Sequence, residues 1–470
     1  MGNFILQRIK WVFFLGFVML FSCDFRVEPI FRSDDANRDL EDIIANGKLV
    51  AVTDFNTTNY FIYKGKPMGY QYEMLQYLAA QLNVKLELVA ENNLEKAFQM
   101  LEKGEVDLIA NNLTITSKRK EKYSFTVPHG QTRQVVVQRK QSEPSDTMLI
   151  INPLDLGGKI VYVQEGSASA QRLRNLSDEI GTPIVIVEMP NYQADQLIEL
   201  VANGDIDYTV CDEDIALVNA AIHGNVDAST AVSFPQNVAW AVRPGAEKLL
   251  AELDTWLSTF TKTAEYKMIY RRYYENPRIA TMFQSGFLYV RKGKISIYDE
   301  DIKSQSIQID WDWRLLASLI YQESRFNHDV VSHKGAYGLM QFMPATADYW
   351  GIDYDADPHS QLKAGVKYLK WLDEKFVLNN VDSTERVKFI LAAYNAGIGH
   401  VLDARNLARK YGKNPDVWEG NVDYFLLNKS KPEYYKDSVV KFGYCRGEET
   451  YNYVKEVMER YDHYRNIIRP

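Results

Sequence analysis

The stretch Gln322-Glu323-Ser324-Arg325-Phe326-Asn327 decides how the C-terminal part of this chain folds. Leucine and isoleucine recur at helical spacing in residues 311–321, just before it, and this pattern predicts a helix with one buried face. Glu323 falls where that helix ends, beside Tyr321 and Phe326. Partly apolar surroundings raise the pKa of a carboxyl group, which suits a general acid near neutral pH. A lone glutamate at a helix end is more often simply exposed, so the following residues decide between the two interpretations.

The segment after this stretch is rich in turn residues, with Gly335, Gly338 and Pro344. Such residues predict a tight loop rather than a continuing helix. Ser332 and Gln341 lie within this loop. We expect the loop to aim these two polar side chains back at Glu323.

Three separated motifs resemble the soluble-lytic-transglycosylase family, which has a goose-type-lysozyme-like fold. The motifs are Glu323–Asn327 with Ser332–Ala336 and Gly338–Pro344, then Ala393–Gly397, then Glu449-Thr450 with Tyr453-Val454. The resemblance covers residues 305 to 465 and implies a mainly α catalytic domain within 305–470. It implies that Glu323 is the catalytic acid. It also implies that five polar residues bind or order the glycan: Ser332, Gln341, Tyr394, Asn395 and Glu449. Glu449 would act through Tyr394.

The matched motifs contain one acid at a catalytic position, whereas glycoside cleavage usually needs two carboxylates. Asp329 is near in sequence but is not a motif residue. A one-carboxylate mechanism fits lytic transglycosylases. Glu323 would protonate the oxygen between N-acetylmuramic acid and N-acetylglucosamine and then take the proton of the muramoyl C6 hydroxyl, leaving a 1,6-anhydro product. The 2-acetamido group, oriented by Ser332, would replace the missing nucleophile.

The chain has 470 residues and a formal net charge of -8. This length predicts more than one domain, and the acidic balance argues against a nucleic-acid-binding surface. Cys211 and Cys445 have no metal-ligand spacing, so we expect both to be small buried apolar residues. We expect no metal and no cofactor.

Residues 1–22 have the features of an export signal, with Arg8 and Lys10 before a short apolar run. Ser22 directly before Cys23 resembles a bacterial lipobox, which implies that Cys23 is lipidated and that residues 23–45 form a tether. A simple signal peptide with an incidental cysteine and an uncleaved anchor are the alternatives. We expect a lipid-anchored protein at the periplasmic face of the envelope, on the outer membrane, although Asp24 leaves the inner membrane open.

Strand and helix patterns alternate through residues 46–270, which predicts an α/β fold with a parallel sheet. Gly104–Leu108 and Gly204–Tyr208 each combine a helix stop, an acidic turn and a strand. We therefore predict two similar lobes, with the chain crossing between them near 133–139 and 238–242. Residues 271–304 would connect the domains. The basic, tyrosine-rich stretch 265–298 that contains most of this connection is expected to pack the two domains together.

Residues 46–270 also resemble the amino-acid-binding family of periplasmic solute-binding proteins. The resemblance rests on Gly69–Met74, Asn112–Arg119 and Phe125–Pro128. It implies that Arg119 and Thr114, with Asn112 nearby, clamp a ligand carboxylate, that Asp212 holds the ammonium group, and that Ser167 lies in a loop that meets the ligand. Ala168 departs from the hydroxyl residue that is often found there.

The chemistry of Arg119 supports this role, because a guanidinium group can bind a carboxylate through two hydrogen bonds. The alternative is that Arg119 is one charge of the exposed basic run at 118–122.

The domain order resembles that of membrane-bound lytic transglycosylases. We therefore expect a membrane-tethered enzyme that acts on peptidoglycan glycan strands. A wall-derived peptide or an amino acid would bind the N-terminal domain and regulate cleavage. Two alternatives stay open: a muramidase that hydrolyses the same bond, and a non-enzymatic solute-binding receptor.

Overall fold

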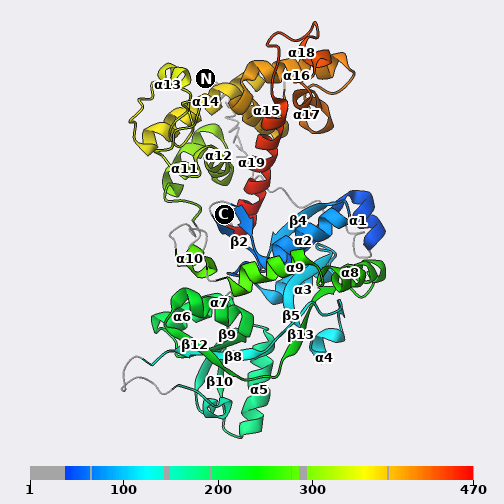
Figure 1. Ribbon diagram of the computed structural model, residues 1–470, viewed down its shortest axis with the longest axis vertical. Helices are drawn as coiled ribbons and strands as arrows, with labels where there is room; N and C mark the ends of the chain where they lie inside the picture. Colours follow the sequence, from blue (N-terminus) through cyan, green and yellow to red (C-terminus); the bar gives the residue numbers. More distant parts are fainter. Residues whose placement is uncertain are drawn as a thin grey trace, which may run out of the picture.

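The computed structural model describes residues 38–63, 66–141, 149–190, 192–276, 278–284, 294–377 and 381–468. Figure 1 shows two α/β lobes in the lower half and a helical domain at the top, with helix α19 (Gly447–Ile467) descending from the helical domain. Two α/β lobes followed by a mainly helical domain agree with the predicted architecture. The predicted export signal and Cys23 lie outside the described residues.

The first lobe is built on a six-stranded sheet with the order β4-β1-β5-β13-β6, and β7 pairs with β13. β1, β4 and β5 are parallel, as the alternation of strands and helices predicts, but β13 is antiparallel to β5. β13 runs the other way because it returns from the second lobe. The strands are β1 (Lys48–Thr53), β4 (Lys85–Ala90), β5 (Leu108–Thr114), β6 (Ser124–Phe125), β7 (Gly130–Thr132) and β13 (Gln236–Val242).

The second lobe has a five-stranded sheet with the order β10-β9-β11-β8-β12. The chain passes between the two sheets after β7 and again after β12, so two segments join the lobes. The strands are β8 (Gln134–Arg139), β9 (Ile160–Gln164), β10 (Val185–Met189), β11 (Tyr208–Asp212) and β12 (Val226–Ala231). The helices that pack on them are α5 (Ala168–Ile180), α6 (Ala194–Asn203) and α7 (Glu213–His223).

Helix α2 (Tyr70–Gln81) packs its apolar face into the first lobe through the fully buried Met74, Leu75 and Leu78. It begins at Gly69, whose φ of 138° lies outside the range that other residues adopt easily. A Cβ atom at this position would lie 2.2 Å from the carbonyl oxygen of Asn59. Glycine is therefore required where α2 crosses the turn that precedes Tyr60.

Three tyrosines of the stretch 265–298 pack within the first lobe, whereas Ile295 and Tyr298, near its other end, pack in the core of the helical domain. Tyr266 and Tyr270, from α9 (Ala264–Tyr270), and Tyr274 pack around Tyr70 with ring centroids 6.3, 6.3 and 5.1 Å away. Tyr70 belongs to the buried core of the first lobe, and the other three rings are partly buried against it. The apolar surface of these rings is therefore buried against the first lobe rather than against the helical domain.

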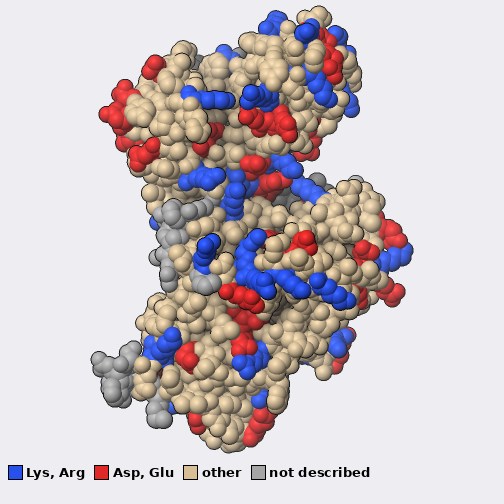
Figure 2. Space-filling model, in the orientation of Figure 1, with Lys and Arg blue, Asp and Glu red and all other residues tan. Residues whose placement is uncertain are grey.

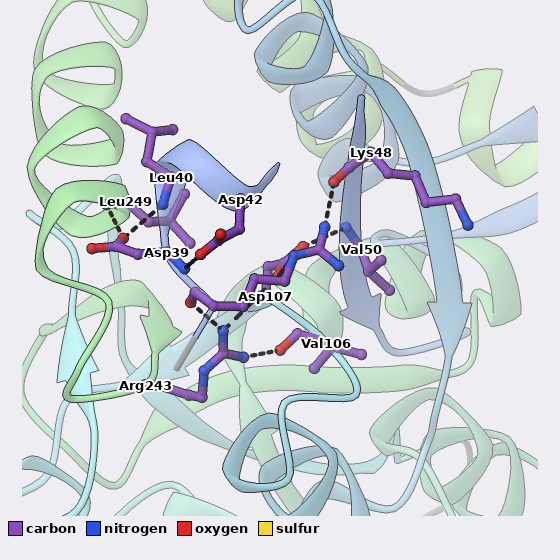
Figure 3. Close-up of polar contacts among 10 residues, drawn as sticks. Asp39, Leu40, Asp42, Lys48, Val50, Val106, Asp107, Arg243 and Leu249 are labelled. Atoms are coloured by element: carbon purple, nitrogen blue, oxygen red, sulfur yellow. Dashed lines mark hydrogen bonds and ion pairs between the residues drawn. The ribbon is translucent and has the colours of Figure 1, made fainter. Parts of the chain in front are cut away.

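Helix α1 (Leu40–Asn46) is held against the first lobe by a buried polar cluster (Figure 3). The carboxylate of Asp39 accepts hydrogen bonds from the backbone N–H groups of Leu40 and Leu249, each at 2.8 Å. Asp107, only 1% exposed, accepts from the backbone N–H of Val50 at 2.8 Å. Arg243 donates to the carbonyl oxygens of Val106 and of Arg38. The point where the predicted tether enters the lobe is therefore fixed by charge-assisted bonds.

The C-terminal helical domain is organised around helix α12 (Trp313–Ser324). Leu315, Leu316, Leu319 and Ile320 are at most 3% exposed, so the predicted helix is confirmed and is buried on more than one side. The surrounding helices are α11 (Asp299–Ser306), α14 (Pro358–Val377), α15 (Ser383–Ala396), α16 (Ile398–Lys410) and α19.

The lower end of α19 provides contacts between the two domains. The hydroxyl of Tyr60 and Nδ1 of His463 share a hydrogen bond of 2.6 Å, and the side-chain amide of Asn466 donates to the carbonyl oxygen of Leu88 in β4. A hollow of about 700 Å³ lies beside this contact. In Figure 2, Lys/Arg and Asp/Glu side chains are interspersed across the middle of the molecule, the level at which α19 reaches the first lobe.

Two further expectations concern single side chains and the membrane. Cys211 and Cys445 are both buried and unpaired, as predicted. No helix among the described residues combines the length and the apolar character needed to cross a membrane.

Candidate functional site

Glu323 lies on the last turn of α12 and is half-buried. It accepts a hydrogen bond from the hydroxyl of Tyr453, which lies on α19. Burial raises the pKa of Glu323 to about 7, and the hydrogen bond from Tyr453 lowers it in part. The carboxyl group can therefore both donate and accept a proton near neutral pH.

Two residues with left-handed backbone end helix α12 directly after the carboxylate. Arg325 has φ 53° and Phe326 has φ 62°, conformations that residues other than glycine rarely adopt. The ring of Phe326 packs against Tyr321 with centroids 5.8 Å apart, which holds this turn on the helix. Strained backbone of this kind is common at functional sites, because the surrounding packing must hold it in place.

The loop after this turn is fixed by its own hydrogen bonds. Gly338 has φ 78°, and a Cβ atom there would lie 2.4 Å from Oε1 of Gln361, which accepts from the backbone N–H of Leu339 at 2.7 Å. Gln341 donates its side-chain amide to the carbonyl oxygens of Val330 and Gly338 at 3.0 and 2.9 Å.

The expectation that Gln341 and Ser332 are aimed at Glu323 is not met by these contacts. The Gln341 amide is used within the loop, and the hydroxyl of Ser332 accepts from the backbone N–H of Ala336 at 2.9 Å. The physical reason is local: a tight loop leaves backbone groups without partners, and its own polar side chains satisfy them first.

Tyr394 lies on α15 and its hydroxyl donates to the carbonyl oxygen of Met340 at 2.6 Å. Burial raises its pKa well above the usual value, and the charge of Glu323 adds to this rise.

Asn395 is exposed and its side-chain oxygen accepts a hydrogen bond from the hydroxyl of Thr450 at 2.8 Å. Glu449 is exposed on the first turn of α19. Tyr394 therefore contacts the loop, and a role of Glu449 through Tyr394 stays a prediction.

Asp329 does not provide a second buried carboxylate. It is exposed, and one of its oxygens lies 3.1 Å from Nε2 of His328. The described part of the chain contains no group of three or more His, Cys, Asp or Glu side chains arranged to hold a metal ion. Glu323, with its partner Tyr453, is a carboxyl group of this site whose pKa lies near neutral pH.

The structure brings the five predicted ligand-binding residues of the N-terminal domain to one cavity between the lobes: Arg119, Thr114, Asn112, Asp212 and Ser167. The cavity has a volume of about 80 Å³. Arg119 reaches across it, with Nη1 on the carbonyl oxygen of Thr114 at 2.9 Å and Nη2 on that of Gly166 at 3.3 Å. Asn219 also bonds across the lobes, to the hydroxyl of Thr57 at 3.0 Å, so the lobes are closed.

Asp212 occupies the N-cap position of α7, but its side chain does not cap the helix. Burial and the charge of Asp214 raise its pKa to about 7, and Arg119 opposes this rise. Ser167 caps α5 through a bond from the backbone N–H of Ala170 at 3.4 Å. The hydroxyl of Ser167 therefore already accepts one hydrogen bond, whereas the carboxylate of Asp212 accepts none from the first turn of α7.

The sequence interpretation missed three residues of these sites. Tyr453 lies in the third motif but was given no role, although it binds the carboxylate directly. Asp54 and Asn59 line the interlobe cavity. A usable signal was present for Asp54, because it directly follows the buried parallel strand β1, and ligands bind at the carboxyl ends of such strands.

Two protein families match this chain in adjacent regions. Residues 48–276 match bacterial extracellular solute-binding proteins, family 3, and residues 302–417 match the transglycosylase SLT domain. A membrane-bound lytic murein transglycosylase F from Desulfosudis oleivorans is 33% identical over 89% of this chain and 90% of its own length. One from Photobacterium profundum is 31% identical over 91% of this chain and 82% of its own length.

Solved structures match the N-terminal half. The ancestral amino acid-binding protein AncCDT-1 covers 50% of this chain with 98% of its own, at 23% identity and a TM-score of 0.42. An ancestral arginine-binding protein bound to arginine covers 48% of this chain with 98% of its own, at 24% identity and a TM-score of 0.43.

Proposed function

The chain belongs to the family of membrane-bound lytic murein transglycosylases F, and from this premise we propose that it cleaves the bond between N-acetylmuramic acid and N-acetylglucosamine without water, leaving 1,6-anhydro ends. It is a lyase that acts on peptidoglycan. The observation that supports the one-acid mechanism is the half-buried carboxyl group of Glu323, with a pKa of about 7 and a tyrosine hydroxyl as its hydrogen-bond partner.

In the first step, protonated Glu323 gives its proton to the glycosidic oxygen, and the bond from the muramoyl C1 to that oxygen breaks. In the second step, the Glu323 carboxylate takes the proton of the C6 hydroxyl while the C6 oxygen bonds to C1. The proton count balances, since Glu323 ends as it began. A pKa near the working pH favours both steps equally.

The remaining predicted glycan-binding residues surround this acid in different ways. Tyr394 and Gln341 stabilise the loop that follows α12, and this loop would present the sugar to Glu323. Asn395 and Glu449 are exposed, which leaves their side chains accessible to a glycan. Ser332 is half-buried and would meet the 2-acetamido group. Each of these roles is part of the proposal.

Helix α19 connects the N-terminal domain to Glu323, and regulation would act through this helix. Tyr453 bonds to Glu323, and His463, ten residues later on the same helix, bonds to Tyr60 of the first lobe. Tyr60 directly follows the turn that carries Asn59, which lines the interlobe cavity. A ligand that closes the lobes would therefore bias the position of the helix that holds the catalytic carboxyl group. The proposed effector is a wall-derived peptide or an amino acid.

The proposal includes a lipid anchor at Cys23, at the periplasmic face of the outer membrane. Its support is the lipobox-like sequence before Cys23 and the membrane-bound relatives. Labelling with a radioactive fatty acid, with Cys23→Ala as the comparison, tests it. Label that persists in Cys23→Ala would contradict the anchor site.

The experiment that tests the enzymatic proposal is digestion of purified sacculi followed by mass spectrometry of the products. Wild type should release muropeptides with anhydro ends, and Glu323→Gln should release none while keeping its folded circular dichroism. Glu374→Gln, an exposed glutamate on α14, is the matched control and should keep full activity. Reducing ends from the wild type would identify a muramidase instead.

A further inference from the structure

The interlobe cavity carries more acceptor groups than one amino acid with a neutral side chain would need. Its lining includes one cationic side chain, Arg119, and two carboxylates, Asp212 and Asp54. Arg119 suits one ligand carboxylate, and Asp212 suits one ammonium group. Asp54 then remains as a second site for a positive charge.

The hydrogen-bond partners of the Asp54 carboxylate orient it but carry no positive charge that would neutralise it. Asn59 and Asn56 donate to its two oxygens, each at 2.7 Å, and both donors are uncharged amides. Burial raises the pKa of Asp54 to about 6, with the bond from Asn59 opposing the rise. A bound cation would relieve this burial cost, because an opposite charge stabilises the ionised form.

Asn59 supplies an independent sign of a missing donor. It is 2% exposed and lines the cavity, and its side-chain nitrogen is committed to Asp54. Because a carboxylate cannot donate, this bond fixes the orientation of the amide. Oδ1 of Asn59 is then left buried with no hydrogen-bond partner within the described residues. A buried acceptor without a donor is costly, and an N–H group of a ligand would satisfy it.

Other ligand classes fit less well. The part of the chain that the structure describes lines the cavity with no aromatic ring, so a stacked sugar or aromatic side chain has no platform. It also offers no cluster of ligands for a metal ion. Arg119 is the one cationic side chain of the lining, so the donors that Asp212, Asp54 and Oδ1 of Asn59 still need would come from cationic nitrogen of a ligand.

We propose that the interlobe pocket binds a small molecule with one carboxylate and two cationic nitrogen groups. The carboxylate would bind Arg119, one cationic group would bind Asp212, and the second would bind Asp54 together with Oδ1 of Asn59. This rests on the proposed amino-acid or peptide effector and names its chemical class. A free basic amino acid and the end of a short wall peptide share this chemistry.

The test is calorimetric titration of the full-length protein with L-lysine, L-norleucine, cadaverine and L-alanyl-L-lysine. L-norleucine lacks the second cation and cadaverine lacks the carboxylate, so each should bind at least about 30-fold more weakly than L-lysine or L-alanyl-L-lysine. If L-lysine binds more tightly than L-alanyl-L-lysine, the natural ligand is a free amino acid. If L-alanyl-L-lysine binds more tightly, the natural ligand is a peptide.

Asp54→Asn should remove most of the preference for L-lysine over L-norleucine, whereas Asp178→Asn, an exposed control in the second lobe, should keep it. Equal affinity for L-norleucine and L-lysine in the wild type would overturn the cationic class but leave an amino-acid effector. Binding of none of the four would overturn both. L-lysine that binds without changing the cleavage rate would support the class and contradict regulation.

Discussion

The hydroxyl of Tyr453 donates a hydrogen bond to the carboxylate of Glu323 across 130 residues of sequence. This bond stabilises the ionised form of an acid whose burial favours the neutral form. The two effects together place the pKa of Glu323 at about 7. The same helix continues to the first lobe, so the partner of Glu323, the proposed catalytic acid, lies on an element that contacts both domains.

Removing the hydroxyl of Tyr453 should change the pH dependence of cleavage. Wild-type activity should fall as pH rises through about 7, because Glu323 must be protonated to act as the acid. Tyr453→Phe removes a bond that favours the carboxylate, so the pKa of Glu323 should rise and the falling limb should move to higher pH. The measurement is kcat/KM against pH. Tyr451→Phe, on the same helix, is the control, and an unmoved limb in Tyr453→Phe would contradict the assigned role.

Glu323→Gln should stabilise the protein at alkaline pH. The folded-state pKa is raised from 4.5 to about 7, so the folded state binds more protons than the unfolded state between these values. Stability contributed by this site is therefore lost as pH rises, by at most about 3 kcal/mol. The melting temperature of Glu323→Gln should exceed that of the wild type at pH values above 7, and the difference should vanish towards pH 4.5. A constant difference across this range would argue against the raised pKa.

The contact between His463 and Tyr60 should couple the two domains. Burial lowers the pKa of His463 to about 4, so its ring is neutral at the interface and shares a hydrogen bond with Tyr60. His463→Ala should leave cleavage without ligand unchanged and should reduce the effect of L-lysine on the cleavage rate. Arg465→Ala, which changes a charge on the same helix, should keep that effect. A full ligand response in His463→Ala would show that α19 does not transmit it.

Asp107 should contribute strongly to the free energy of unfolding of the first lobe. Its buried carboxylate accepts from the backbone N–H of Val50 and lies 3.2 Å from Nε of Arg38. Asp107→Ala would leave buried charge uncompensated and should cost about 3–5 kcal/mol of unfolding free energy. Asp205→Ala, an exposed acid in the second lobe, should change it by less than about 0.5 kcal/mol. Chemical denaturation of both variants makes the comparison, and equal midpoints would contradict it.

Local patterns in the sequence were sufficient to predict the helix that carries Glu323 and the alternation of strands and helices through the two lobes. A resemblance to a known family also selected five of the residues that line the interlobe cavity, but it missed Asp54 and Asn59. The helical period of residues 311–321 is a property of neighbouring residues, and so it is visible without a structure.

What the sequence did not show depends on contacts between distant segments. The partner of Glu323 lies on α19, and no local pattern near Glu323 points to Tyr453. The unsatisfied oxygen of Asn59 emerges only once the bond from Asn59 to Asp54 is known. The tyrosines after residue 264 looked equally suited to an interdomain contact, since only their packing around Tyr70 shows which surface they cover.

The most direct test of the one-acid mechanism is digestion of purified sacculi in water enriched with heavy oxygen. Glu323 should pass its proton between two sugar oxygens without activating water. The muropeptides released by the wild type should therefore carry no heavy oxygen and be lighter by one water than hydrolysis products. Heavy oxygen at C1 of the released muramic acid would contradict this account.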